Sequence, residues 1–202
     1  MKTFVLSTMA VLVALVATAA PPSAPGAARP GQAYRQYIDA LFRADPGQAL
    51  GVIVGRADQI GFIRTFITCL AASNDFRQKY TAVYGQVEWE KFGRDEPEAG
   101  VPAFNLPDKI PLSTYRRLSK KQPEPRGREY IVTLENGVMR IVQRDGKWYL
   151  RADSLGFEGR ASQYEILTAV LREYQTRIGT PGWTPTGLRV AVKQALRRTG
   201  QW

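Results

Sequence analysis

The chain has 202 residues, with 28 lysine and arginine residues against 18 aspartate and glutamate residues, a single cysteine and no histidine. The absence of histidine excludes catalytic triads and dyads that use an imidazole base, and it excludes histidine-ligated metal sites. One cysteine excludes an internal disulfide and the four-cysteine zinc and iron–sulfur sites. Hydrophobic residues at 44% and charged residues at 23% are values typical of a folded globular chain.

Residues 1–20 have the pattern of a secretory signal peptide. Lys2 supplies a positive charge, residues 4–16 form an uncharged apolar run, and residues 17–19 (ATA) match the pattern that signal peptidase cleaves. The alternative is an uncleaved membrane anchor, but the run is shorter than the roughly 20 residues that a spanning helix needs. No cysteine follows the run, so a lipid-modified N-terminus is not expected. We therefore predict an exported, soluble protein, either periplasmic or secreted.

Residues 21–30 (PPSAPGAARP) are predicted to be a flexible linker, and residues 31–202 a single domain. A first helix is predicted after Pro30, because apolar residues there follow the i, i+3, i+4, i+7 spacing of one buried face. These residues are Tyr34, Tyr37, Ile38, Leu41 and Phe42. Residues 45–47 (DPG) are expected to end this helix, and residues 49–54 to form a short helical continuation.

A second helical stretch is predicted over residues 62–84, with a possible break or new cap at residues 73–75 (SND). Gly85 is expected to end it. Cys69 lies in the apolar part of this stretch. That position favours a buried, inert thiol over a reactive one.

A three-stranded antiparallel meander is the clearest local pattern. Residues 128–135, 138–144 and 147–152 are rich in β-branched and aromatic residues. They are joined by Asn136-Gly137 and Asp145-Gly146, dipeptides that tolerate the positive φ of tight hairpin turns. The preceding residues 93–127 contain six prolines and are expected to be irregular. Residues 86–92 and 101–106 are candidates for additional edge strands.

Two further helices are predicted after the meander. Ser162 and Glu165 form a capping box, and Gly179 ends the helix behind it. Thr184 is expected to cap a last helix that has Pro185 at its first position. N-terminal helices, a meander of three or more strands and C-terminal helices together predict an α+β fold.

The opening helix at residues 34–45 (YRQYIDALFRAD) and the late strand at residues 142–150 (VQRDGKWYL) resemble the NTF2-like (SnoaL-like, cone-shaped α+β) superfamily. The resemblance implies a curved sheet that wraps around helices and leaves a conical pocket. The chain departs from the superfamily's pattern, since only three strands are clear and two helices follow the meander. Dehydratases, isomerases and many non-enzymes share this fold, so the resemblance implies no particular activity.

NTF2-like enzymes use Asp, Tyr and His residues in catalysis. This sequence contains no catalytic motif that matches those residues. Tyr34, Tyr37 and Asp39 are the candidates on the first helix, but periodicity predicts both tyrosines in the core and Asp39 on the solvent face. Glu88 and Glu90 would share one face of a strand, at a separation that suits glycoside hydrolysis, but exposed carboxylates of this kind are common. We predict no catalytic, metal or cofactor site, with a histidine-independent carboxylate or tyrosine enzyme as an alternative.

Positive charge is concentrated in two segments. In residues 109–128, which begin at Lys109, the lysines and arginines are accompanied by a single acidic residue, Glu124. No acidic residue follows residue 174. The last helix is predicted to carry a basic stripe at i, i+4, i+8 spacing. The candidate anion-contact residues of both segments are Arg116, Arg117, Lys120, Lys121, Arg126, Arg128, Arg189, Lys193 and Arg197. The alternative is a solvated loop together with cations that favour a helix C-terminus.

The leading functional hypothesis is an exported, non-catalytic domain that binds a small ligand or a protein partner through its pocket or a face of its sheet. The alternative is a peripheral protein that binds an anionic envelope surface or polymer through residues 109–128 and 189–198. Nucleic acid is the least expected partner, because no base-reading motif is present. No transmembrane segment is expected after cleavage at the signal peptide.

Overall fold

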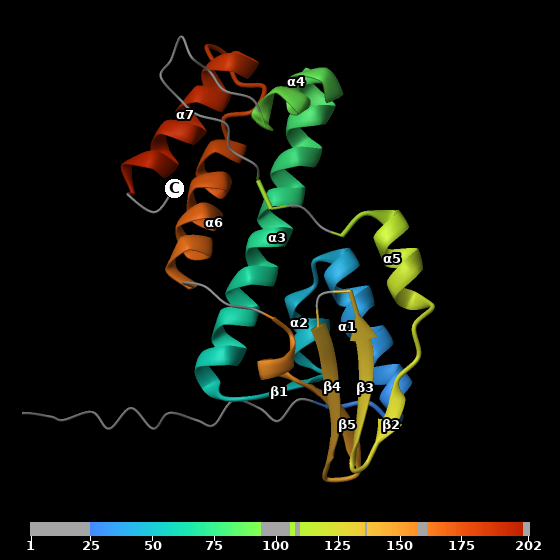
Figure 1. Cartoon of the computed structure of the whole chain (residues 1–202). Coiled ribbons are helices and arrows are strands. Elements are labelled where there is room, and N and C mark those ends of the chain that lie inside the picture. Colours follow the sequence, from blue (N-terminus) through green and yellow to red (C-terminus); the bar gives the residue numbers. More distant parts are fainter. Residues whose placement is uncertain (1–24, 94–105, 108–109, 136, 157–160, 200–202) are drawn as a thin grey trace, which may run out of the picture.

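The computed structural model describes residues 25–93, 106–107, 110–135, 137–156 and 161–199. The predicted signal peptide therefore lies outside the described residues. Helices, a mixed sheet and further helices follow one another along the chain, which confirms the predicted α+β class (Figure 1).

The helices are α1 (Pro30–Arg43), α2 (Pro46–Leu50), α3 (Ala57–Tyr84), α4 (Gln86–Glu90), α5 (Leu112–Ser119), α6 (Ala161–Gln175) and α7 (Pro185–Arg198), with the short 3-10 helices η1 (Lys91–Gly93) and η3 (Ala152–Ser154). The strands are β1 (Ile53–Val54), β2 (Glu124–Arg126), β3 (Glu129–Leu134), β4 (Gly137–Arg144) and β5 (Lys147–Arg151).

The predicted meander is confirmed as the centre of a five-stranded sheet, in the order β1-β5-β4-β3-β2. Strands β3, β4 and β5 pair antiparallel. Asp145 and Gly146 have φ angles of 51° and 73°, as expected for the tight turn between β4 and β5. Strand β2 adds to β3 antiparallel, and β1 adds to β5 in parallel. Residues 53–54 therefore extend the sheet, contrary to the helical continuation expected there.

The structure corrects four other local expectations. Ala27 is buried and exchanges two backbone hydrogen bonds with Trp148, so the predicted linker is anchored on the sheet at this residue. Helix α3 runs without a break through residues 73–75. Residues 86–90 form helix α4 where an edge strand was expected, and the expected irregular region contains helix α5.

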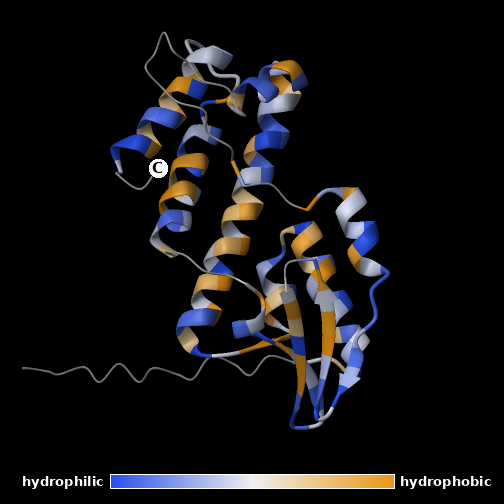
Figure 2. Cartoon of the chain, viewed as in Figure 1, coloured by the Kyte–Doolittle hydropathy of each residue, from blue (hydrophilic) through white to orange (hydrophobic). Residues whose placement is uncertain are grey.

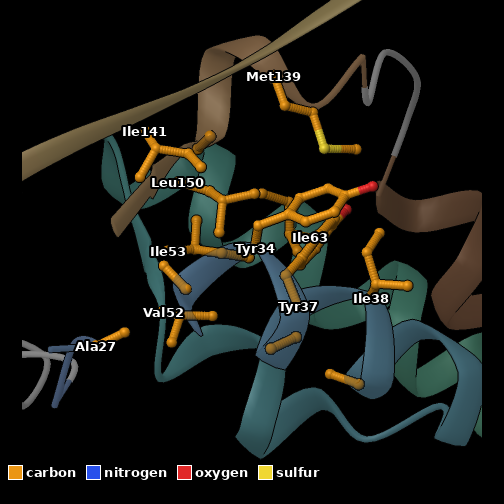
Figure 3. Close-up of a cluster of buried hydrophobic side chains, with 14 of the residues drawn as sticks. Ala27, Tyr34, Tyr37, Ile38, Val52, Ile53, Ile63, Met139, Ile141 and Leu150 are labelled. Atoms are coloured by element: carbon orange, nitrogen blue, oxygen red, sulfur yellow. The ribbon is translucent and has the colours of Figure 1, made fainter. Parts of the chain in front are cut away.

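One hydrophobic core lies between the sheet, α1, α2 and the first half of α3. Tyr34 and Tyr37 of α1 lie in this core, as their spacing predicts, and Figure 3 shows them among side chains from the strands and from α3. Ile53, Ile141 and Leu150 contribute from three neighbouring strands. The inner face of the sheet is therefore covered by helix, whereas no described helix covers its outer face (Figure 1).

A second hydrophobic core lies among the second half of α3, η1, α6 and α7. Phe76 and Tyr80 of α3 pack there with Leu171 of α6 and Val192 of α7. Helix α3 has 28 residues and is therefore about 42 Å long at a rise of 1.5 Å per residue. Because α3 supplies residues to both cores, it connects the sheet half of the molecule to the helical half (Figure 1).

Cys69 is fully buried in the second core, and burial raises the pKa of its thiol to about 11. The thiol should therefore react with a disulfide reagent at neutral pH only after the chain unfolds, because the thiolate is the reactive form. Thiol titration with and without denaturant checks this expectation. Rapid stoichiometric labelling of the native protein would contradict it.

Candidate anion-binding face

Helix α5 is anchored on α1 by polar and aromatic contacts on one side. The hydroxyl of Tyr115 donates to Asp39 Oδ1 at 2.8 Å, and the Tyr115 ring stacks on Phe42 with centroids 4.5 Å apart. The Asp39 carboxylate raises the pKa of the Tyr115 phenol through this hydrogen bond. From α1, the Tyr34 hydroxyl donates to the Leu118 carbonyl at 3.0 Å. These contacts fix which side of α5 points to solvent.

The solvent side of α5 carries a basic stripe that includes one apolar residue. Leu112, Arg116 and Lys120 follow one another at i, i+4, i+8 spacing and are all exposed, Leu112 to 50%. Arg117 is also exposed and pairs with Glu135. Two of the three positions at this spacing on α5 are basic, and the first is apolar.

The chain after α5 continues the positive charge to the edge of the sheet. Lys121 donates to the backbone carbonyl of Thr133 at 2.7 Å, and Arg126 and Arg128 are exposed at and beyond the edge strand β2. Figure 2 shows the segment that joins α5 to β2 in hydrophilic colour. Pro125 in β2 lacks an N–H donor, which disfavours addition of another strand at this edge.

Arginines of α1 border the same region. Arg35 and Arg43 are exposed and lie close enough to Tyr115 to lower its pKa electrostatically. Gly31, in the first turn of α1, lies beside Pro123 in the segment between α5 and β2. We call this region the basic face; it comprises Arg29, Arg35, Arg43, Arg116, Arg117, Lys120, Lys121, Arg126 and Arg128. The acidic residues beside it are Asp39, Glu124, Glu129 and Glu135; Glu129 lies opposite Arg126 in the sheet and pairs with Arg151.

The exposed stripe predicted on the last helix is not formed. Arg189 and Lys193 are each only 3% exposed, and of the three predicted residues only Arg197 lies at the surface. The two buried cations lie beside the core residues Leu188 and Val192 in the sequence of α7, and their burial shows that neighbouring elements cover them. The structure thus places Arg189 and Lys193 inside the helical half and away from any exposed anion-contact surface.

Arg189 is held by a network that joins α4 to α7. It donates to Glu88 Oε2 at 2.6 Å, to the Tyr80 hydroxyl at 3.2 Å and to Thr186 Oγ1 at 3.1 Å. Lys91 pairs with the other oxygen of the Glu88 carboxylate. Hydrogen bonds from Lys91 and then Arg189 hold the pKa of Glu88 below its ordinary value. Glu88 therefore has a structural role as the counter-ion of a buried guanidinium.

The other catalytic candidates do not come together. Tyr34 and Tyr37 are buried in the first core, and Asp39 is half-buried beneath Tyr115. Glu90 lies on the short helix α4 and accepts from Gln86 at 3.2 Å. Among the described residues, the buried polar side chains are Ser73, Thr168, Arg189 and Lys193, with no carboxylate. Within the same residues, no group of three or more histidine, cysteine, aspartate or glutamate side chains is arranged to hold a metal ion.

Replacing Tyr34 with phenylalanine should lower the free energy of unfolding by about 1 kcal/mol, because the Leu118 carbonyl in the last turn of α5 loses its donor. Burial raises the pKa of Tyr34 to about 12, whereas a phenol in an unfolded chain titrates near 10. The folded state holds this proton more tightly, so its contribution to stability is lost as pH rises from about 10 towards 12. Urea unfolding of both proteins across this range checks the effect; equal stabilities at neutral pH would contradict it.

Comparison with known protein families finds no family model that matches the chain, and comparisons with curated proteins and with solved structures find no match. The resemblance to the NTF2-like superfamily therefore stays a prediction. Across the described ranges, no helix has both the length and the apolar character needed to cross a bilayer.

Proposed function

We propose that this chain is an exported, non-catalytic binding protein that contacts anionic membrane surfaces through its basic face. The observation that carries the proposal is the concentration of exposed arginine and lysine side chains along α5, β2 and the adjoining part of α1, with few acidic residues beside them. Each basic side chain near an anionic lipid surface contributes about 1 kcal/mol of attraction. Several together supply a useful affinity even though each contact is weak.

The apolar residue in the α5 stripe favours a membrane over a soluble anionic polymer. Leu112 is half-exposed on the same side of the helix as Arg116 and Lys120. Helices that lie at a membrane interface combine cationic and apolar side chains in this way, because the apolar group gains by leaving water at the headgroup boundary. A polymer that binds by charge alone makes no use of an exposed leucine.

The position of the residues that precede α1 also supports contact with a membrane. Gly31, in the first turn of α1, lies beside the segment between α5 and β2, and Arg29 immediately precedes this helix. About ten residues separate the predicted apolar run from Ala27, the first residue paired with the sheet. Ten residues span at most about 35 Å even when fully extended. Until the predicted cleavage occurs, the basic face is therefore held close to the membrane that takes up the apolar run.

The proposal is tested by vesicle flotation with the chain that begins at Pro21, which keeps every described residue and omits the apolar run. We expect binding to phosphatidylcholine vesicles that contain phosphatidylglycerol, and no binding to vesicles of phosphatidylcholine alone. Dextran sulfate serves as the soluble anionic polymer in a parallel binding measurement. Equal binding to both vesicle types, or tight binding to dextran sulfate with none to either vesicle, would contradict the proposal.

A further inference from the structure

The uncovered outer face of the sheet contains a hollow of about 430 Å³ at the end where β1 and β5 run in parallel. This volume lies within the range of small-molecule sites. Alternation along the strands places Arg144 and Val142 of β4, together with Arg151 of β5, on the face opposite the core residues Ile141 and Leu150. The end of β1, the connection to α3 and the first turn of α3 close the other side of the hollow with Val54, Gly55, Arg56 and Gln59.

Arg151 is held in position by two carboxylates and still has unused donors. Its Nε and one terminal nitrogen donate to Asp153, at 3.1 and 2.5 Å, and the other terminal nitrogen donates to Glu129 at 3.1 Å. A guanidinium has five N–H donors, so these bonds leave part of its capacity for a ligand. Both oxygens of Asp153 are occupied by Arg151, so this carboxylate in the lining is already neutralised.

The hollow contains more donors than acceptors. Arg56 is paired with Asp58 through one edge of its guanidinium, which leaves the remaining N–H groups unused. Arg144 has no side-chain hydrogen bond or ion pair with any residue that the structure describes. Three guanidinium groups from three segments therefore line one hollow, and one of them has no carboxylate partner among the described residues. Val54, Val142 and Ala152 supply apolar walls beside them.

We propose that this hollow binds a small organic anion. A carboxylate or phosphate group of the ligand accepts from Arg144 and from the unused donors of Arg56 and Arg151, since an oxyanion has only acceptors and matches a site rich in donors. The carbon skeleton of the ligand lies against Val54 and Val142. This site is separate from the basic face and does not depend on membrane binding.

The test uses two probes, inorganic phosphate and succinate, added at constant ionic strength to the ¹⁵N-labelled chain that begins at Pro21. We expect at least one probe to shift the amide signals of Gly55 and Ala152 saturably; the stronger of the two identifies the preferred oxyanion. Arg144→Gln should weaken binding about tenfold or more, because hydrogen bonds to a charged group are lost. Arg198→Gln, which removes a similar exposed charge from α7, outside both the hollow and the basic face, should leave the dissociation constant unchanged.

Thermal unfolding of both variants is the control for folding. Both variants should keep the fold, because both side chains are exposed. Shifts that do not saturate with either probe would overturn the proposal. Equal weakening by the two variants would also overturn it, since that result indicates attraction by net charge alone.

Discussion

Neutralising three residues of the basic face should weaken binding to anionic vesicles by about a hundredfold. The variant Arg116→Gln/Lys120→Gln/Arg126→Gln removes charges whose combined attraction to the surface is about 3 kcal/mol, and 1.4 kcal/mol corresponds to a factor of ten. All three side chains are exposed, so the fold should be unaffected. Titration of vesicles containing phosphatidylglycerol gives the dissociation constant of each protein.

A matched control separates the basic face from net charge. Arg64→Gln/Arg172→Gln/Arg198→Gln removes the same number of exposed charges from α3, α6 and α7, none of which belongs to the basic face. This control should bind nearly as tightly as the unmodified chain, because its substitutions lie away from the proposed contact. If both triple variants lose the same affinity, the basic face has no special role.

Replacing Glu88 with glutamine should lower the free energy of unfolding by about 2 kcal/mol. The substitution removes the Glu88 carboxylate that pairs with the guanidinium of Arg189, which is only 3% exposed. Loss of one partner from a fully buried ion pair costs about 3–5 kcal/mol, and the value here is smaller because Glu88 itself is 23% exposed. Urea unfolding measures the difference.

Two further variants test whether the ion pair is the cause. Glu90→Gln makes the same chemical change on the same short helix at an exposed site, and should leave stability within about 0.5 kcal/mol of the unmodified chain. In a background of Arg189→Met, the substitution Glu88→Gln should cost much less, because the buried charge is already absent. Equal costs in both backgrounds would show that Glu88 acts independently of Arg189.

The same pair gives a pH dependence with a definite sign. The pKa of Glu88 is lower in the folded protein than its ordinary value, because hydrogen bonds from Lys91 and Arg189 favour the carboxylate. Its stabilisation is therefore complete above the pKa of the unfolded chain and is lost as pH falls through the folded value. The Glu88→Gln variant should lack this part of the acid-induced loss of stability.

The central part of the fold was predictable because its determinants are local. Asp145-Gly146 specifies a tight turn between adjacent strands, and Thr184 caps α7 through a hydrogen bond from the Gly187 N–H at 3.0 Å. The edge strands were not predictable in the same way. Strand β1 has two residues and pairs with the distant strand β5, and β2 has only three residues, which pair with β3 across residues 127–128. Segments this short carry no usable periodicity.

The candidate site was predictable in part for a related reason. Sequence composition identified residues 109–128 as basic, but the prolines around α5 concealed a helix whose exposed side depends on Tyr115 packing against α1. On α7, spacing alone suggested an exposed stripe at Arg189 and Lys193. Burial of those residues depends on the packing of neighbouring elements, including α4, which brings Glu88 to Arg189 across a separation of 101 residues. Helical periodicity contains no information about such a partner.

The measurement that tests the proposed membrane contact most directly is the salt dependence of vesicle binding by the chain that begins at Pro21. Raising the ionic strength from about 0.1 M to about 1 M shortens the Debye length from about 10 Å to about 3 Å. Because the contact is made by exposed charges, the dissociation constant for vesicles containing phosphatidylglycerol should rise more than tenfold over this range. A dissociation constant that does not change with salt would contradict the assignment of the basic face as the membrane-binding surface.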